Sequence, residues 1–453
     1  MSCDKFFFQL LSAVSQGKER LLFWQMVLSV LVSFMFFLGT AAAQEEFSFD
    51  LEEFEKKSLA WGGYAEMKFE HSEVNQKSAF ALLGSSGDPR SSLDRFTTTL
   101  QVDGSYSKGI ASFNWVVQGY HRWDQEQWAD EVSIFEAYAS IKPTPLASID
   151  LGKKVFKWGK GYAWNPVGFI NRPKDPNNPE ESMEGYIGAE LDLIKSFEGP
   201  LQTVALTTVV LPVQDNINED FGKNDNINFA AKLYLLYRDV DIDFLLYTGN
   251  SRTTRYGVDF STNLATNFEI HGELAHIPNQ SQKILNADGS VETREIADTS
   301  YLLGLRYLTE NDITTIIEYY HNDDGYTEQE LNRFFELVDD ADDLFTQTSD
   351  DSLYRKAASI SEGAYGSSQI GRNYLYAKVT QKEPFDLLYF TPGVTAILNL
   401  DDNSFTLSPE TVYTGFTNWE LRLRYSLLVG SRFTEFGEKL NENKLELRVR
   451  YFF

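Results

Sequence analysis

The chain has 453 residues, of which 66 are acidic and 40 are basic, so its formal net charge at pH 7 is −26. Such an acidic chain lacks the basic face that nucleic-acid binding requires, and we expect no nucleic-acid partner. Its only cysteine is Cys3, which excludes a framework of intrachain disulfides.

The first 43 residues have the three parts of a secretory signal peptide. A charged segment at 18–20 precedes an apolar run at 21–39, and small residues follow at 41–43. The apolar run is also compatible with a membrane anchor, but the alanine-rich end favours cleavage after Ala43. Cleavage changes the net charge to −27, because residues 1–43 hold three basic and two acidic side chains. We expect 1–43 to be a cleaved signal peptide, 44–60 a short periplasmic arm and 61–453 the remaining domain.

From Trp61 onward, apolar and polar residues alternate with the period of two that is typical of β-strands. Eighteen segments show this alternation, and sixteen strands remain if 253–263 and one neighbour are loops. The predicted strands are 61–70, 92–104, 110–122, 131–142, 146–157, 185–195, 200–211, 226–237, 240–249, 253–263, 266–277, 299–308, 312–320, 371–380, 387–398, 404–415, 418–429 and 444–453.

The connections between these predicted strands alternate between long and short. Outer-membrane barrels have this asymmetry, with long outer loops, short periplasmic turns and an even number of strands. An even number of strands places both ends of the barrel segment on the same side of the membrane. Because the short turns lie on that side, we predict that both ends lie in the periplasm. The long connections lie near 71–91, 158–184, 212–225, 278–298, 321–370 and 430–443.

The final strand carries the alternation to the last residue of the chain. Leu447 and Val449 share one face with the aromatic residues Tyr451 and Phe453. A secretory leader combined with a terminal Phe resembles the Gram-negative outer-membrane β-barrel proteins. The resemblance implies that Tyr451 and Phe453 form a signal read by the barrel-assembly machinery. It also implies an outer-membrane location, in contact with lipids and lipopolysaccharide.

We therefore predict an all-β fold, a transmembrane antiparallel up-and-down β-barrel of about eighteen strands. The sheet must close, because lipid offers no hydrogen-bond partners to an open sheet edge. In a soluble barrel the apolar faces would fill the core, whereas in a membrane they face outward and the polar faces line the interior. Periodicity alone does not distinguish the two, but the leader and the terminal Phe favour the membrane barrel.

The connection within 153–185 has a composition unlike the other loops. Its seven glycine and proline residues between 159 and 179 exclude a regular strand or a long helix. Trp158, Tyr162 and Trp164 are too apolar for a free loop, so we expect them to pack inside the barrel. The stretch is similar in placement to the inward loop that narrows porin-type barrels. The alternative is a rim loop packed outside the pore.

The connection 321–370 contains a predicted short amphipathic helix at 328–345. Four aspartates, at 339, 340, 342 and 343, offer oxygen ligands for a hard cation, but the fixed glycine of an EF-hand loop is missing. A solvated acidic surface is the favoured interpretation, and we expect neither a metal nor a cofactor.

Basic residues of the 153–185 connection and of the last two strands are the candidates for lining the pore. Arginines of the last two strands become neighbours of carboxylates on the first strand when the barrel closes. The favoured interpretation is a salt-bridged wall, and the alternative is a basic track that guides anions. The candidate constriction and lumen residues are Lys157, Trp158, Lys160, Tyr162, Trp164, Arg172, Lys174, Arg422, Arg424, Arg448 and Arg450.

The predicted function is a porin-like channel for small polar solutes, with a preference for anions. Two alternatives remain: a conduit that exports polysaccharide or lipid, similar to eighteen-stranded alginate-exporter-type barrels, and a closed barrel that serves as an adhesin or receptor. The five histidines are scattered, and we find no nucleophile, phosphate-loop or zinc motif, so an enzyme is not expected. A homo-oligomer and a monomer are both compatible with the pattern.

Overall fold

The computed structural model describes residues 58–85, 90–124, 127–181 and 183–453. The predicted signal peptide and nearly all of the predicted periplasmic arm, residues 1–57, lie outside these ranges. Residues 58–453 form one compact unit.

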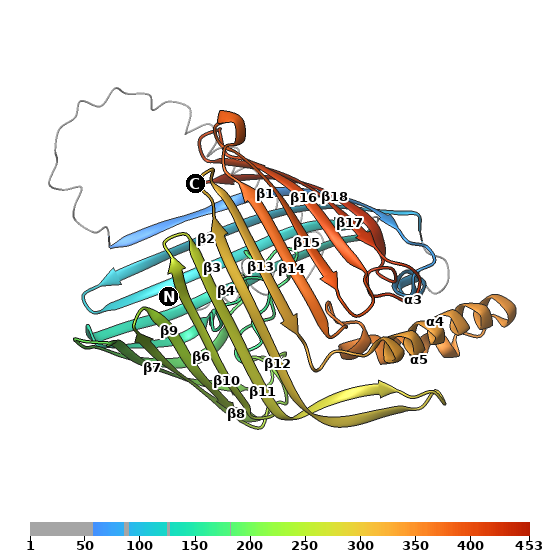
Figure 1. Ribbon diagram of the computed structural model, residues 1–453, viewed down its shortest axis with the longest axis horizontal. Helices are drawn as coiled ribbons and strands as arrows, with labels where there is room; N and C mark the ends of the chain where they lie inside the picture. The colour runs from blue at the N-terminus through green and yellow to red at the C-terminus, as the bar shows by residue number, and fades with distance from the viewer. Residues whose placement is uncertain (1–57, 86–89, 125–126, 182) are drawn as a thin grey trace, which may run out of the picture. The chain divides into compact units, whose positions relative to one another are not determined.

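Eighteen β-strands make up this unit (Figure 1). Each predicted strand corresponds to one observed strand. They are β1 (Leu59–Val74), β2 (Ser92–Lys108), β3 (Ala111–Asp124), β4 (Gln127–Thr144), β5 (Ala147–Lys154), β6 (Tyr186–Ser196), β7 (Leu201–Val213), β8 (Asn226–Tyr237), β9 (Val240–Thr248), β10 (Arg255–Ala265), β11 (Phe268–Leu285), β12 (Val291–Leu308), β13 (Ile313–His321), β14 (Asn373–Gln381), β15 (Phe390–Asn399), β16 (Phe405–Tyr413), β17 (Trp419–Val429) and β18 (Asn441–Phe452).

Each strand pairs with its neighbours in the sequence, and every pairing is antiparallel. The last strand pairs with the first, from Tyr64 opposite Phe452 to Val74 opposite Asn441, so the sheet closes into a barrel. Closure leaves no free sheet edge, as a membrane requires. The prediction of a closed antiparallel barrel of eighteen strands is confirmed, and the alternative of sixteen is wrong.

The connections differ between the two ends of the barrel. Every connection from an odd to an even strand lies at one end, which we call the long-loop end; among these are 155–185 and 322–372. The other connections define the short-turn end, where most turns are brief, such as 109–110 and 238–239. β1 begins and β18 ends at this short-turn end.

One predicted long loop, 278–298, is instead part of a hairpin. β11 and β12 stay paired out to Leu285 opposite Val291, and only a five-residue turn, 286–290, joins them. The prediction of a loop was wrong because most side chains in this stretch are polar on both faces, so the period of two is not visible in hydropathy.

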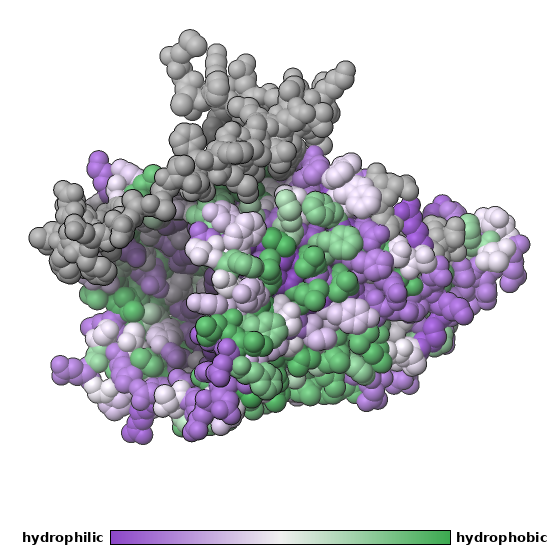
Figure 2. Space-filling model, turned by 90° about the horizontal axis from the view of Figure 1, so that it is seen from above, coloured by the Kyte–Doolittle hydropathy of each residue, from purple (hydrophilic) through white to green (hydrophobic). Residues whose placement is uncertain are grey.

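Apolar side chains face outward and charged side chains face inward. On β18, Leu447 is 47% exposed, whereas Glu446 and Arg448 are each 4% exposed. The same alternation on β1 exposes Met67 and buries Glu66. In Figure 2, apolar residues gather in the middle of the face in view, and hydrophilic residues lie to either side. This arrangement is the reverse of a soluble barrel and suits lipid outside and water inside.

Helices of the described residues pack together at the long-loop end. They are α3 (Ala79–Ser85), α4 (Glu328–Thr348), α5 (Ser352–Ile360) and the π-helix η3 (Ser361–Tyr365), while the 3-10 helix η4 (Pro384–Asp386) lies in a short-turn connection. The amphipathic helix predicted at 328–345 is confirmed as α4, which begins with a capping box between Thr327 and Glu330. Among the described residues, no helix combines the length and apolar character needed to cross a membrane.

The helices share a core with the protruding hairpin. Phe334, Phe335 and Val338 of α4 are fully buried against Tyr365 and against Ile284 of β11. Figure 1 shows α4 and α5 beside the ends of β11 and β12. The buried face of α4 thus has its partner within the chain, and its acidic face points away from this core. Asp342 accepts a hydrogen bond from Tyr354 at 2.8 Å, and Asp339 pairs with Arg432.

Candidate functional site: a loop across the barrel interior

The connection between β5 and β6, residues 155–185, folds into the barrel, and we call it the inward loop. Its first part packs on the inner wall, where Trp158 (4% exposed) and Phe169 (1%) belong to one apolar cluster with Leu211 and Tyr247. The inward-facing side chains of β7 are apolar here, because they meet protein and not water. Burial of these rings therefore fixes one side of the loop to the wall.

A buried carboxylate on β11, Glu273, holds the middle of the inward loop. Its Oε1 atom accepts hydrogen bonds from the backbone N–H groups of Lys160 at 2.5 Å and Gly161 at 2.6 Å. The same oxygen accepts from the Asn165 amide at 2.9 Å, and Oε2 accepts from the Val167 N–H at 3.2 Å. Hydrogen bonds to an ionised acceptor are stronger than neutral ones, so this single side chain gathers residues 160–167 around it.

A second buried carboxylate, Glu318 of β13, holds the next residues of the loop. It accepts from the backbone N–H of Tyr162 and, at 2.8 Å, from that of Ala163. The His271 ring nitrogen Nε2 lies 2.9 Å from the same carboxylate. Glu318 is completely buried, so it needs these partners to be tolerated in the interior.

Gly159 permits the close approach to Glu273. Its φ of +101° lies in the region that favours glycine, and a Cβ atom there would sit 2.7 Å from Glu273 Oε1 and 2.5 Å from Asn165 Nδ2. A side chain at this position would therefore push the loop away from its anchor.

The inward loop reaches the opposite wall of the barrel. Lys378 of β14 donates a hydrogen bond to the Tyr162 hydroxyl at 2.8 Å, and that hydroxyl donates to Glu180 at 2.5 Å. β14 lies nine strands from β5 in either direction around the eighteen-stranded ring. Arg424 of β17 also donates to the Asn177 carbonyl at 3.0 Å. A segment that contacts both walls must cross the interior.

Trp164 packs where the inward loop meets a second inserted connection, 430–440. Its ring stacks on Tyr320 at 5.2 Å and shares an apolar cluster with Tyr374 and Phe436. Buried Glu435 accepts hydrogen bonds from the Tyr374 hydroxyl at 2.6 Å and from Asn399 at 2.8 Å, and so fixes 430–440 in this position.

The four basic residues of the inward loop lie in different surroundings. Lys157 is exposed and has no ion pair within 4 Å among the described residues. The Lys160 ammonium lies 3.1 Å from Asp243 of β9. Arg172 pairs with Asp220 and lies 3.6 Å from Glu184. Lys174 donates to the carbonyls of Gly161 at 2.7 Å and Tyr162 at 3.2 Å.

Burial changes the protonation of the loop residues in different directions. It lowers the pKa of Lys174, which has backbone carbonyls as its nearest partners. Burial also opposes the charge on Lys160, but Asp243 and Asp259 outweigh that effect and raise the pKa of its ammonium. Burial and the hydrogen bond to Glu180 raise the pKa of the Tyr162 hydroxyl well above its usual range. Tyr162 is therefore a neutral hydrogen-bonding group.

The four arginines of the last strands are paired with carboxylates. Arg424 lies 2.6 Å from Glu410, and Arg422 lies 3.6 Å from Glu420. On β18, Arg448 lies 3.0 Å from Glu446 and Arg450 lies 2.6 Å from Glu66 of β1. Such pairs match the interpretation as a salt-bridged wall. Of these four arginines, only Arg422 lines one of the three cavities that adjoin the inward loop.

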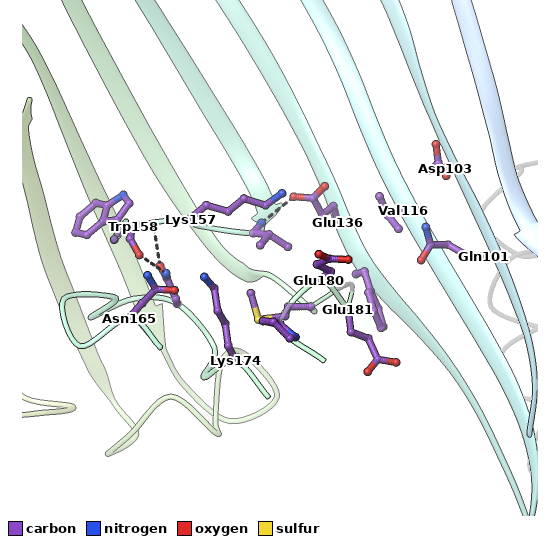
Figure 3. Close-up of a pocket in the computed structure, with 16 residues that line it drawn as sticks. Gln101, Asp103, Val116, Glu136, Lys157, Trp158, Asn165, Lys174, Glu180 and Glu181 are labelled. Atoms are coloured by element: carbon purple, nitrogen blue, oxygen red, sulfur yellow. Dashed lines mark hydrogen bonds between the residues drawn. The ribbon is translucent and has the colours of Figure 1, made fainter. Parts of the chain in front are cut away.

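Three cavities adjoin the inward loop. A central cavity of about 470 Å³ lies between the loop and β2–β4 (Figure 3). In Figure 3, Lys174 projects between Asn165 on one side and Glu180 on the other, and Gln101 and Asp103 stand on the facing wall.

The other two cavities lie on opposite sides of the loop. The short-turn cavity, about 650 Å³, is lined by Thr314, Thr391 and Arg422, which lie near the beginnings of odd strands. The long-loop cavity, about 360 Å³, is lined by Arg252 and Asp324 from long-loop connections. Lys174 lines all three cavities, so the inward loop stands between spaces that open toward the two ends.

The predicted assembly residues lie at the seam where the barrel closes. Phe453 exchanges backbone hydrogen bonds with Gly63 at 3.1 and 3.2 Å, and its ring lies 6.1 Å from that of Trp61. Tyr451 packs on Trp419 with ring centroids 5.0 Å apart. The terminal residues thus complete the pairing of the last strand with the first.

Sequence reasoning missed the groups that hold the inward loop in place. Glu273, Glu318 and Lys378 are not among the candidate residues that the sequence pattern predicts. Glu318 does stand out in the sequence, because it is a single acidic residue between Ile317 and Tyr319 on a strand that otherwise has no acid. That signal marks a buried carboxylate, but it does not tell which backbone will approach it.

An eighteen-stranded, closed antiparallel barrel with a loop inserted into its interior is therefore the class of protein that this fold defines. Among solved structures, OccK8 (OprE) of Pseudomonas aeruginosa is similar, with a TM-score of 0.51 and 8% identity over 87% of this chain and 98% of that one. OprD of the same organism has a TM-score of 0.47 and 11% identity over 90% and 99% of the chains. OccAB1 of Acinetobacter baumannii has a TM-score of 0.48 and 11% identity over 87% and 96%. No family model and no curated protein sequence matches the chain. At 8% identity, the similarity to OccK8 supports the barrel fold and nothing beyond it.

Proposed function

We propose that the protein is an outer-membrane channel of a Gram-negative bacterium, through which small polar solutes diffuse passively. The observation that carries this proposal is the inward loop, which touches opposite walls of a charged interior while cavities remain on both sides of it. OccK8 (OprE) of Pseudomonas aeruginosa has a similar barrel fold.

The outer surface supports the membrane location. Exposed apolar side chains alternate with buried charged ones along β1 and β18. Apolar surface on this scale is unfavourable in water and favourable in lipid. In this location the short-turn end faces the periplasm and the long loops face outward. Tyr451 and Phe453 serve as the signal for the assembly machinery, and the acidic outer loops lie near lipopolysaccharide.

The interior supports a channel with weak anion preference. Nine lysines and arginines and eight aspartates and glutamates line the three cavities, although the whole chain has a net charge of −26. The acidic excess is therefore located elsewhere. Outer-loop acids more than about one Debye length away, about 8 Å at physiological salt, have little effect on the constriction. Lys157 and Lys174, which lack carboxylate partners within ion-pair distance among the described residues, leave positive charge beside the path.

Conductance in planar lipid bilayers tests the channel. Purified protein is expected to produce discrete ion-conducting steps and a reversal potential in a salt gradient that indicates a modest preference for anions. Cation preference would reject the role of the loop lysines, and a folded protein without any conductance would reject the channel in favour of a closed receptor or adhesin.

A further inference from the structure

Three buried carboxyl groups stand in a row on the wall that the inward loop covers. Asp243 of β9 lies directly opposite Asp259 of β10, and Asp259 lies directly opposite Glu273 of β11. Their exposed fractions are 2%, 1% and 4%. Residues directly opposite each other on antiparallel strands have Cβ atoms about 4.5–5.5 Å apart, and like charges at such positions repel. The row therefore needs compensating partners.

Glu273 has such partners, but Asp243 and Asp259, which we call the carboxyl pair, have few. Glu273 is occupied by the hydrogen bonds from the inward loop. The carboxyl pair has one cation within ion-pair distance among the described residues. This is the Lys160 ammonium, 3.1 Å from Asp243 and 4.0 Å from Asp259. Two ionised carboxylates and one ammonium would leave a negative charge uncompensated in the interior, which is costly.

Three of the four oxygens of the carboxyl pair have no hydrogen-bond partner in the part of the chain that the structure describes. They are Asp243 Oδ1 and both oxygens of Asp259. Buried polar atoms are almost always hydrogen-bonded, so a polar or positive partner is missing from this account. Neither side chain lines any of the three cavities around the inward loop, so that partner is not a solute held in them.

Other titratable groups face the carboxyl pair from the neighbouring strands. Tyr234 of β8 lies opposite Asp243, and its hydroxyl donates to Asp241 of β9. Lys232, the next residue along β8 on the same face, makes no ion pair within 4 Å with either member of the pair. None of these groups supplies the missing positive charge at close range.

A proton supplies both the charge and the hydrogen bond. A protonated carboxyl group donates to a neighbouring carboxylate, and two acids in one site tend not to ionise together. A metal ion is the competing partner. Among the described residues, no three acidic, histidine or cysteine side chains are grouped so that they could hold one, and the Lys160 ammonium already stands beside the pair.

We propose that Asp243 and Asp259 share one proton at neutral pH and, together with Lys160, form a proton-dependent contact that holds the inward loop against β9 and β10. The contact is electrically neutral, because the pair then carries one negative charge and Lys160 one positive charge. Its effect on solute passage rests on the proposed channel, whereas the contact itself does not.

The proposal fixes the direction of a pH effect on the loop. When the loop opens, water reaches both acids, and both are ionised at neutral pH. The closed loop therefore binds one proton more than the open loop. By linkage, the open fraction rises about tenfold per pH unit for as long as the closed pair keeps its proton. Acid conditions thus favour the closed loop, and alkaline conditions favour the open one.

Hydrogen–deuterium exchange of the detergent-solubilised, folded protein measures loop opening without requiring conductance. The readout is the protection of the backbone N–H groups of residues 160–163, corrected at each pH for the exchange rate of an unstructured peptide. We expect this protection to fall about tenfold per pH unit between pH 6 and pH 8. Asp259→Asn and Asp243→Asn should each abolish the slope, because one remaining acid has no partner with which to share a proton.

The matched control is Asp192→Asn. Asp192 of β6 accepts a hydrogen bond from the Thr207 hydroxyl at 2.6 Å and lies outside the row. This variant should keep the wild-type slope, and heat-modifiable mobility verifies that all three variants are folded.

Each other outcome overturns a stated part of the proposal. A flat pH profile in the wild type, or a slope that persists in both pair variants, would reject the shared proton. A slope lost only in Asp259→Asn would show one titrating acid and overturn the sharing. Protection that depends on added CaCl₂ or NaCl, at an ionic strength held constant with choline chloride, and not on pH would assign the charge to a metal ion.

Conductance separates this proposal from the channel. A conducting protein without the pH slope would overturn the proton-dependent contact and leave the proposed channel intact. The slope in a folded protein that does not conduct would support the contact and reject the channel.

Discussion

Two carboxylates decide where the inward loop lies. Glu273 and Glu318 are buried in the barrel interior and receive backbone N–H groups from residues 160–167. A buried carboxylate without such donors would be costly, and loop amides without an acceptor would be costly as well. The loop N–H groups and the wall carboxylates therefore supply each other's hydrogen bonds. Replacement of one of the two acids is expected to loosen the loop without unfolding the barrel.

Glu273→Gln tests this anchoring. The variant loses the negative charge and one acceptor oxygen, and charge-assisted hydrogen bonds contribute about 1.5–3 kcal/mol each. Opening of the loop should become roughly ten- to a hundredfold more frequent. The rate of tryptic cleavage at Lys160 and Lys174 in the folded protein measures how often the loop opens. Glu295→Gln, which changes an exposed carboxylate of the protruding hairpin, is the control. Equal cleavage in wild type and Glu273→Gln would contradict the anchoring role.

Asp324 predicts a pH dependence of ion preference. Burial and then the neighbouring Asp298 raise the pKa of Asp324 to about 6, against the lowering effects of Gln280 and Arg255. The carboxyl group is thus ionised at pH 7.5 and protonated at pH 5, so acidification removes a negative charge from the long-loop cavity. Anion preference, measured as reversal potential, should increase as pH falls through 6. The Asp324→Asn variant should lack part of that increase in anion preference. If its pH profile is identical to that of the wild type, protonation of Asp324 is not the cause.

Among the elements, the strands were the most predictable and the loops the least. A strand between lipid and water must alternate apolar and polar residues, so β1 and β18 are visible in the sequence. Where both faces meet water, as at 278–298, the alternation disappears, and the hairpin was missed. The apolar rings of 153–185 required burial and predicted an inward loop. Its contacts with Glu273 and Lys378 depend on strands distant in the sequence, which no local pattern encodes.

Leu447→Arg tests the assignment of the two strand faces. Leu447 is 47% exposed on the outer face, and an arginine there would meet lipid. The cost in unfolding free energy is expected to be about 2–4 kcal/mol near the membrane midplane. Leu447→Met, which keeps an apolar side chain, should cost little. Equilibrium unfolding in urea with lipid vesicles provides the comparison, and equal stability of the two variants would place this face in water.

Deletion of Phe453 tests the terminal strand as an assembly signal. The residue completes the pairing with Gly63 at the seam and packs beside Trp61. We expect less folded, heat-modifiable barrel in the outer-membrane fraction, whereas Phe453→Tyr, which keeps the aromatic ring, should assemble nearly normally. Unchanged assembly of the deletion variant would show that the terminal aromatic residue is not needed.

At the scale of the whole molecule, a closed ring of eighteen strands provides a charged interior, and the inward loop divides it. The loop is attached at β5 and β6 and contacts the far wall at β14, so any solute that passes through the interior must pass beside it. Cavities lie on its two sides. The central claim is therefore that residues 155–185 form the constriction of a conducting pore.

The most direct test is the single-channel conductance of a protein in which residues 160–180 are replaced by a short Gly–Ser linker. The control replaces the 286–290 turn in the same way, and heat-modifiable mobility verifies that both variants are folded. The loop variant is expected to conduct more current per channel than the wild type, with a weaker preference for anions, and the turn variant should match the wild type. Unchanged conductance in the folded loop variant would contradict the claim that this segment narrows the pore.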